Sequence, residues 1–330
     1  MKKRRKWMAA GALLLLLAGG ALLLWRNGKS SGHKNPSLIY IPKTEDGTND
    51  FWTLLISGTR MAAAEYGASL TVLAPETEQD VGQQEEYLRM AIEEKPDAIL
   101  ISPSSLEGYE EAFEEAKKAG IPLVFVDSYT SCQVQDLTVA TDNLEAGRLL
   151  GEYARSLVDA EARIAVVSHV KGVSTAVERE RGFREGLGSL QNNIVEVVYC
   201  DSLFEKAEKL AAELMEKYPD LEMIAGMNEY SSVGAARAVK KAGAQDHIRI
   251  VGVDSSQEAV QLMEQGIFQG LVVQKAFKMG FMSVKETIRM LQGERVERVQ
   301  DSGCQLVTPE NMYSSEIEKL LFPFDTGKNR

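Results

Sequence analysis

The chain is poor in cysteine and histidine, with three of each among its 330 residues. The cysteines, Cys132, Cys200 and Cys304, are too few for a disulfide framework, and their spacing matches no metal site. We therefore expect unpaired or singly paired thiols, no metal and no cofactor. Whether Cys132 pairs with Cys304 stays open.

The sequence also lacks the motifs of common enzymes. It contains no evident Ser-His-Asp set, no pair of catalytic carboxylates and no phosphate loop. The glycines of Gly182-Phe183-Arg184-Glu185-Gly186 fall inside an expected helix, whereas a phosphate loop follows a strand. A hydrolase or dehydrogenase is thus the least favoured of three hypotheses, behind a transport receptor and a sensor, and we expect no enzymatic activity.

Positive charge is scarce outside the amino terminus. The net charge is −11, and residues 2–6 are all Lys or Arg, so without these five cations the remainder carries −16. Binding to nucleic-acid phosphates needs concentrated cations. The sequence therefore predicts an acidic, soluble body that does not bind nucleic acid.

Charge is absent from residues 8–25, which are rich in Leu, Ala and Gly and follow the basic cluster. A helix of this length would span about 27 Å, close to the hydrocarbon thickness of a bilayer. Its positive end should stay in the cytoplasm, so the body faces outward. We expect an uncleaved membrane anchor and a polar tether within residues 1–36, with a cleaved signal peptide as the alternative.

From Leu38 onward, short apolar runs alternate with amphipathic stretches, which is the signature of βαβ units with parallel sheets. The first half predicts strands at 38–41, 69–74, 98–102, 122–126 and 137–140. The second half predicts strands near 163–168, 194–199, 223–226, 248–253 and 270–273. Helices are expected between them. Two similar halves predict an α/β fold of two Rossmann-like lobes with a ligand cleft between them.

Polar or aromatic side chains follow five of the predicted strands. Ligands of parallel sheets bind beyond the carboxyl ends of the strands, so these residues are expected to bind a small polar ligand. They are Asn49 with Phe51 and Trp52, then Asp127, Asn228, Asp254 and Gln274.

Structural alternatives stay open for several of these residues. Asn49 can cap a helix, and so can an aspartate that ends a strand. Adjacent aromatics cannot both face inward on a helix, so one of Phe51 and Trp52 should be free to stack on the C–H face of a sugar. Arg179 and Arg181 suit a solvated helix face as well as a ligand site.

Several motifs together resemble the ribose-binding-protein-like family of periplasmic sugar-binding proteins, the substrate-binding components of ABC sugar importers. The resemblance covers about residues 37–311. The related repressors are excluded, because no helix-turn-helix precedes this region. The motifs are Asn49-Asp50-Phe51-Trp52, Phe125-Val126-Asp127, Thr141-Asp142-Asn143, Arg179-Glu180-Arg181-Gly182-Phe183, Asn228-Glu229, Gly252-Val253-Asp254 and Val273-Gln274.

The resemblance implies the type I periplasmic-binding-protein fold, with two lobes joined by a three-strand hinge. Hinge crossings are implied near 141–142, 274–275 and 303–304. The first lobe would comprise 38–141 plus 275–303, and the second 142–274 plus 304–313, leaving 314–330 as a peripheral tail. It also implies ligand roles for the strand-end residues named above.

Two departures from ribose binders affect specificity. Ser128, which we include among the expected ligand-binding residues together with Arg179, stands where they carry an arginine, and Val177 stands at a second arginine position. Each lost arginine forfeits charge-assisted bonds of about 1.5–3 kcal/mol. Pentose specificity is therefore not inherited, and a sugar, a polyol or an amine-bearing ligand stays open.

The sequence thus predicts an extracytoplasmic, membrane-anchored solute-binding protein that closes around a small polar ligand. Its expected partner is the permease of an ABC importer. The alternative is a ligand-sensing receptor that signals to a membrane histidine kinase or another sensor.

Overall fold

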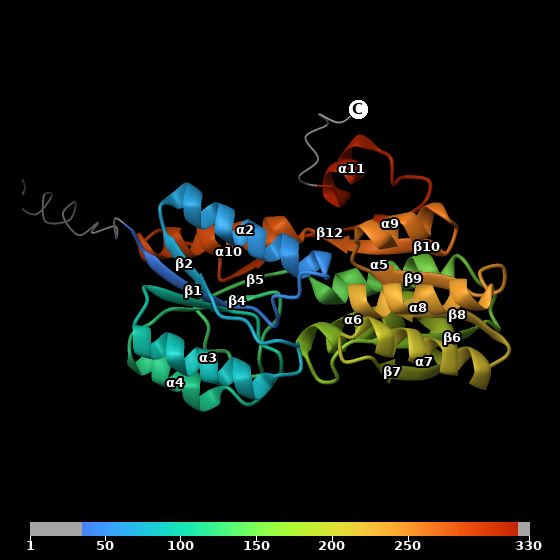
Figure 1. Cartoon of the computed structure of the whole chain (residues 1–330), viewed down its shortest axis with the longest axis horizontal. Coiled ribbons are helices and arrows are strands. Elements are labelled where there is room, and N and C mark those ends of the chain that lie inside the picture. The colour runs from blue at the N-terminus through green and yellow to red at the C-terminus, as the bar shows by residue number, and fades with distance from the viewer. Residues whose placement is uncertain (1–34, 323–330) are drawn as a thin grey trace, which may run out of the picture.

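The structure, a computed structural model, describes residues 35–322, which fold into two α/β lobes lying side by side (Figure 1). The first lobe contains a six-stranded sheet in the order β11-β5-β4-β3-β1-β2. Its strands are β1 (Ser37–Ile41), β2 (Ser69–Val72), β3 (Ala98–Ile101), β4 (Leu123–Val126), β5 (Leu137–Ala140) and β11 (Val299–Asp301).

Helices cover both faces of this sheet. Leu38 and Tyr40 of β1 pack with α2 (Asp50–Tyr66) and α10 (Ala276–Leu291). Ile39 and Ile41 point the other way and pack with α3 (Val81–Glu94) and α4 (Glu110–Lys118). Because successive strand residues face opposite sides, a parallel sheet covered on both faces requires such continuous apolar strands.

The second lobe repeats the three-layer plan. Its sheet has the order β12-β10-β9-β8-β6-β7. The strands are β6 (Arg163–Ser168), β7 (Ile194–Tyr199), β8 (Leu221–Gly226), β9 (Arg249–Val253), β10 (Phe268–Gln274) and β12 (Cys304–Val307).

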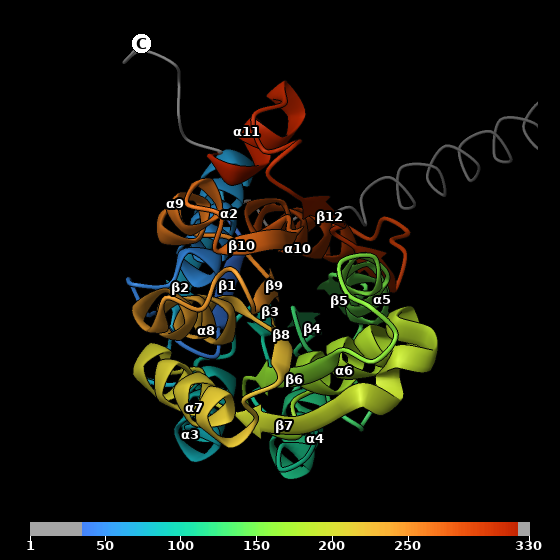
Figure 2. The same ribbon diagram turned by 90° about the vertical axis from the view of Figure 1, so that its right-hand side faces the viewer.

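Five helices enclose the second sheet. On one face lie α5 (Asn143–Arg155) and α6 (Ser174–Leu187), which leads into the 3-10 helix η1 (Gly188–Asn193). The other face carries α7 (Phe204–Lys217), α8 (Glu229–Ala242) and α9 (Gln257–Glu264). Figure 2 shows α5 and α6 on one side of this sheet and α7 and α8 on the other.

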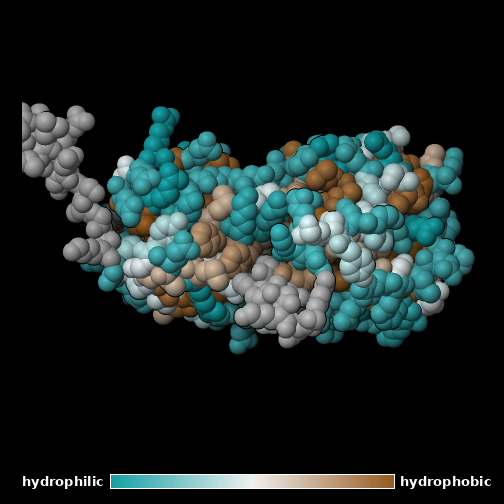
Figure 3. Space-filling model, turned by 90° about the horizontal axis from the view of Figure 1, so that it is seen from above, coloured by the Kyte–Doolittle hydropathy of each residue, from teal (hydrophilic) through white to brown (hydrophobic). Residues whose placement is uncertain are grey.

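The chain passes between the lobes three times, from β5 to α5, from β10 to α10 and from β11 to β12. Among residues 35–322, all strand pairs are parallel except β10 with β12. The crossings bond to one another, because Lys275 N donates to Gly303 O at 3.2 Å and the Thr141 and Ser302 hydroxyls lie 3.2 Å apart. Seen from above, the molecule narrows between the lobes and its surface is largely hydrophilic (Figure 3).

Two glycines allow α2 and α10 to pack closely. A Cβ on Gly58 would lie 2.2 Å from the Phe277 carbonyl oxygen, and one on Gly280 would lie 2.0 Å from that of Leu55. Because both contacts are with backbone atoms, neither glycine can be replaced without moving a helix. This contact holds the amino-terminal ends of both helices beside the hinge.

The predicted fold class is confirmed, but the sequence missed three elements near the carboxyl terminus. These are β11, β12 and α11 (Ser315–Leu321), the last of which lies within the segment predicted to be a peripheral tail. Within residues 35–322, no helix is long and apolar enough to cross a membrane. The predicted anchor at 8–25 and the end of the tail at 323–330 lie outside the described residues.

Candidate functional site

A narrow cavity of about 20 Å³ lies between the lobes, at the carboxyl ends of strands from both sheets. The structure brings eight of the nine predicted site residues to its wall: Asn49, Phe51, Trp52, Asp127, Arg179, Asn228, Asp254 and Gln274. The first four come from the first lobe and the last four from the second.

Ser128 is the exception. Its side chain is fully buried, and its hydroxyl donates to the Pro103 carbonyl oxygen at 2.8 Å. It does not line the cavity. The position next to the strand-end aspartate therefore stabilises a loop of the first lobe.

The two strand-end aspartates adopt the same unusual backbone conformation. Asp127 has a φ of 67° and Asp254 a φ of 73°. Non-glycine residues are uncommon in this left-handed region, and such strain often occurs at functional sites. Neither aspartate caps the helix after its strand, because β4 is followed by β5 and because Ser256 caps α9.

Asp127 forms a buried ion pair with Lys43. The Lys43 Nζ lies 2.8 Å from Asp127 Oδ2, and each side chain is 3% exposed. The same ammonium lies 5.7 Å from the centroid of the Trp52 ring, within the range of a cation–π contact. The sequence prediction found no certain cation for this site, and Lys43 supplies one.

Asp254 lies on the second lobe's side of the cavity. Its Oδ1 accepts a hydrogen bond from Gln274 Nε2 at 2.7 Å, and its Oδ2 accepts one from the backbone N–H of Glu229 at 3.1 Å. Burial raises the pKa of this carboxyl, although Arg179 and the Gln274 bond oppose the shift.

Two helices begin at the cavity, and an asparagine caps each of them. Asn49 accepts a hydrogen bond from Trp52 N at 3.0 Å at the start of α2. Asn228 accepts one from Ser231 N at 3.0 Å at the start of α8, where Ser231 completes a capping box. The structural alternative for Asn49 is thus correct, and it is compatible with a place on the cavity wall.

The paired aromatics are both buried. The Phe51 and Trp52 rings meet edge to face with centroids 5.1 Å apart, and both line the cavity. The indole Nε1 of Trp52 donates to Glu78 at 2.6 Å. Trp52 is thereby fixed in orientation, as a stacking surface for a ligand must be.

Arg179 is also buried, which rules out the solvated helix face for this residue but not for the exposed Arg181. Its Nε donates to Asn143 Oδ1 and its Nη1 to the Met227 carbonyl oxygen, both at 2.8 Å. The guanidinium thus connects α5, α6 and the end of β8 beside the cavity.

The lobes are in contact around the cavity, so the cleft is closed. Glu229 accepts hydrogen bonds from the backbone N–H groups of Asp50 at 3.2 Å and Phe51 at 3.0 Å. The Tyr230 hydroxyl donates to Asp46 at 2.8 Å. Burial, followed by the charges of Asp254 and Asp50, holds the pKa of Glu229 well above its usual value despite those bonds.

Two buried atoms of the cavity wall have no hydrogen-bond partner: His169 Nδ1 and Gln274 Oε1. The other ring nitrogen of His169 bonds to the Thr175 hydroxyl at 2.8 Å. Burial, and then the positive charges of Arg179 and Lys43, hold the pKa of His169 well below 6.5, so the ring is neutral. Unpaired buried polar atoms are costly unless a ligand or water satisfies them.

Six cavity residues were not among the predicted site residues: Lys43, Glu78, His169, Thr175, Glu229 and Tyr230. The strand-end rule could have selected His169, which directly follows β6, and Lys43, which lies two residues after β1. Glu78 lies in a long loop after β2 and carries no such signal. Tyr230 and Thr175 lie within the first turns of helices.

The described part of the chain contains no cluster of His, Cys, Asp or Glu that could hold a metal ion. The three cysteines are all free, which leaves Cys132 and Cys304 unpaired.

A family model described as a periplasmic binding protein domain matches residues 40–295. A solved sugar transporter from Clostridium phytofermentans is 41% identical, with a TM-score of 0.79 over 83% of this chain and 99% of that one. A solute-binding protein from Agrobacterium vitis, solved with bound D-fucose, is 29% identical, with a TM-score of 0.81 and coverage of 86% and 99%. The ribose import binding protein of Bacillus subtilis is 23% identical, over 86% of this chain and 91% of its own length.

Proposed function

Because the chain belongs to the ribose-binding-protein-like family of periplasmic binding proteins, we propose that it is an extracytoplasmic receptor for a neutral sugar. It closes around the sugar and delivers it to an ABC importer. It acts by binding and not by catalysis.

The closed cleft with unsatisfied polar atoms carries this proposal. His169 Nδ1 and Gln274 Oε1 lack partners in a buried cavity whose walls also include the rings of Phe51 and Trp52. Sugar hydroxyls can pair with such atoms, and the C–H faces of a sugar suit aromatic rings.

The ligand is neutral because the charges of the wall already have partners. Lys43 pairs with Asp127, and Glu78 accepts from both Trp52 and Ser202. Arg179, Glu229 and Asp254 are likewise bonded to protein groups. A charged ligand would have to displace some of these bonds, which is costly in a buried site. Sugar hydroxyls can instead add to lone pairs that the carboxylates still offer.

Closure about the hinge produces the function. We propose that residues 38–141 with 275–303 and residues 142–274 with 304–313 move as two bodies about the three crossings. Such hinge closure is general for periplasmic binding proteins. A ligand that touches both lobes binds the closed state better than the open one and shifts the population toward it.

A membrane partner then recognises the closed, ligand-loaded protein. An ABC importer is favoured by the solute-binding proteins and import proteins among the chain's relatives. In membranes containing the cognate importer, the ligand-loaded protein should stimulate ATP hydrolysis and solute uptake. A receptor that serves a sensor kinase would instead change phosphorylation without uptake.

The amino terminus fits an anchor to the cytoplasmic membrane, since residues 8–25 carry no charge and follow five cations. This part of the proposal concerns residues that the structure does not describe. The full chain expressed in cells should sediment with membranes and be digested by added protease in spheroplasts. A fully soluble, shortened chain would instead indicate cleavage.

A calorimetric screen tests the proposed function. The purified protein is titrated with neutral monosaccharides, polyols, amino sugars and sugar acids. We expect saturable 1:1 binding of a neutral sugar with a Kd near or below micromolar, about −8 kcal/mol, and recovery of unchanged sugar afterwards. Preference for a charged ligand, or conversion of the sugar, would contradict the proposal.

A further inference from the structure

A second hollow adjoins the cavity on the hinge side. It is a groove of about 250 Å³, considerably larger than the cavity of about 20 Å³. Phe51, Asp254 and Gln274 line both spaces. The two are therefore separated by no more than these side chains.

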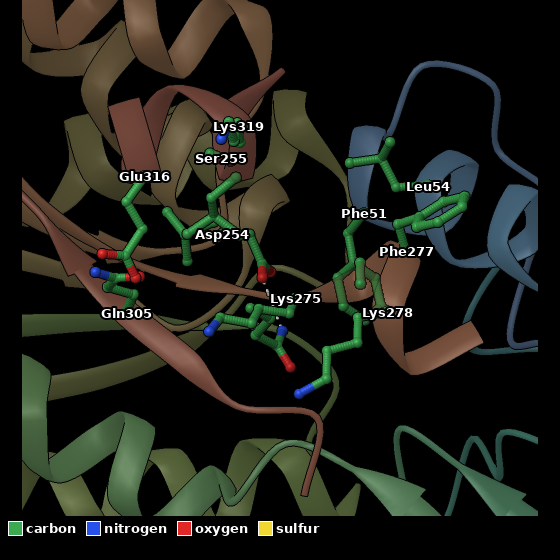
Figure 4. A pocket seen from close by; sticks show the side chains of 14 residues that line it. Phe51, Leu54, Asp254, Ser255, Lys275, Phe277, Lys278, Gln305, Glu316 and Lys319 are labelled. Atoms are coloured by element: carbon green, nitrogen blue, oxygen red, sulfur yellow. Dashed lines mark hydrogen bonds between the residues drawn. The ribbon is translucent and has the colours of Figure 1, made fainter. Parts of the chain in front are cut away.

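One side of the groove is apolar. Phe51 and Leu54 come from α2, and Phe277 comes from α10. Figure 4 shows these three side chains gathered along one wall. The close packing at Gly58 and Gly280 places the two helices together and so sets this wall in position.

The opposite side is a polar rim. Figure 4 shows Gln305 of β12 with Glu316 and Lys319 of α11 across from the apolar wall, and Lys275 between the two sides. The helix α11 is fixed by its buried Ile317, while Leu320 also lines the groove. Aromatic faces opposed by amide, carboxylate and ammonium groups suit a ring that has an apolar face and polar edges.

We propose, on the basis of the proposed function, that this groove is a second subsite and that the ligand is a glycoside. One sugar ring occupies the cavity. A substituent on it leaves between Phe51, Asp254 and Gln274, and its second ring lies against Phe51, Leu54 and Phe277. The second ring is either another sugar or an aryl group, because both have an apolar face.

Volume and chemistry both favour a glycoside over a free monosaccharide. In the closed structure the cavity alone offers only about 20 Å³ of free space, whereas the adjoining groove offers about 250 Å³. A free monosaccharide would leave the groove unused. Because Phe51 belongs to both walls, it would contact both rings of a glycoside.

The test compares each monosaccharide that binds with its disaccharides and its aryl glycosides, using calorimetry on the full protein. We expect a glycoside to bind at least tenfold more tightly than its parent sugar. Whether the disaccharide or the aryl glycoside shows this gain identifies the second ring.

Two groove variants distinguish a contact with the second ring from a change that affects all sugar binding. Phe277→Ala and Leu320→Ser should weaken glycoside binding about five- to tenfold and leave monosaccharide binding unchanged. Leu320 is only partly buried on α11, so its variant is expected to fold even if Phe277→Ala does not. Val299→Ala, at a residue 69% exposed and outside the groove, is the matched control.

The outcomes separate this proposal from the one on which it rests. Monosaccharide binding with no gain for any glycoside would overturn the second subsite and leave the proposed function standing. An equal loss of affinity for the monosaccharide and the glycoside, in groove variants that fold, would also overturn the second subsite. Failure of every neutral sugar and glycoside to bind would overturn both.

Discussion

Glu229 of the second lobe accepts hydrogen bonds from the backbone N–H groups of Asp50 and Phe51, at the first turn of α2 in the first lobe. Asp50 makes the reciprocal contact, because its Oδ2 accepts from Gln257 N at the start of α9 at 3.0 Å. Free N–H groups at a helix amino terminus need such acceptors, and these bonds partly offset the cost of burying the carboxyl group. Each lobe thus supplies the carboxylate for a helix of the other, and both contacts exist only when the cleft is closed.

The first prediction concerns pH and Glu229. Closure buries this carboxyl and raises its pKa, so the closed state favours its protonated form. The resulting stabilisation is present below the ordinary pKa of a glutamate and is lost as the pH rises through the raised value. Ligand affinity should therefore decrease with rising pH in that window, by at most tenfold per pH unit for one proton.

The variant Glu229→Gln isolates this contribution. His169, whose pKa is lowered, acts in the opposite direction near its ordinary pKa of 6.5, but it is common to both proteins. The ratio of wild-type to variant affinity should therefore fall as the pH rises. Glu222→Gln, at an exposed position on β8, should leave the wild-type profile unchanged. A ratio independent of pH would disprove the role of Glu229.

The second prediction is that Asp254→Asn weakens sugar binding about ten- to a hundredfold, which corresponds to about 1.4–2.7 kcal/mol. The change removes a charged acceptor from the cavity wall but keeps its shape. Asparagine also tolerates the φ of 73° at this position, but its NH2 group cannot accept one of the two hydrogen bonds that Asp254 accepts, so the melting temperature should also fall. Calorimetry and thermal unfolding measure the two effects, and unchanged affinity would remove Asp254 from the site.

The third prediction concerns the buried pair of Lys43 and Asp127. Lys43→Met leaves the Asp127 carboxylate buried without its counter-ion, which should cost about 3–5 kcal/mol of stability. The double variant Lys43→Met/Asp127→Asn should recover a large part of that stability but not the sugar affinity. Denaturant unfolding of both variants and of Asp127→Asn completes the cycle. Additive effects on stability would show that the two groups do not interact.

The fourth prediction is that Trp52→Phe weakens binding about tenfold, or about 1.4 kcal/mol. It removes the N–H that donates to Glu78, whose other oxygen accepts from Ser202 of the second lobe at 2.6 Å. The carboxylate that joins the two lobes is then only partly satisfied. Tyr313→Phe, which removes an exposed hydroxyl contact to Glu264, should bind as the wild type does. Equal sugar affinities of the wild type, Trp52→Phe and Tyr313→Phe would contradict a role for the Trp52–Glu78 hydrogen bond in binding.

Much of the fold and half of the cavity wall could be predicted from the sequence, for one physical reason. Apolar strands alternating with helices imply parallel sheets, and the residues after such strands must meet at one edge, as Asp127 and Asp254 do. Contacts between the lobes could not be predicted this way. Glu78 is in a loop without periodicity, and its partner Ser202 is distant in sequence, so their meeting depends on how the lobes close.

The strands β11 and β12 were not predicted because of local features of their sequences. The strand β11 is short and largely exposed, with Val299 69% accessible, so it lacks the apolar run that marks the other strands. The strand β12 pairs antiparallel with β10 after a tight crossing, and no helix precedes it. The predicted role of Ser128 rested on its position next to Asp127, but the left-handed turn at Asp127 directs the chain toward Pro103.

The fluorescence of Trp52 tests the central claim most directly, because this residue lies on the cavity wall. The chain has three tryptophans, and replacing Trp7 and Trp25 by Phe leaves Trp52 as the single probe. Titration with a neutral sugar that binds should change the emission of Trp52 saturably, with the Kd found by calorimetry, and Asp254→Asn should shift the curve to at least tenfold higher concentration. Binding by calorimetry with no change in Trp52 emission would place the sugar elsewhere and contradict a site between the lobes.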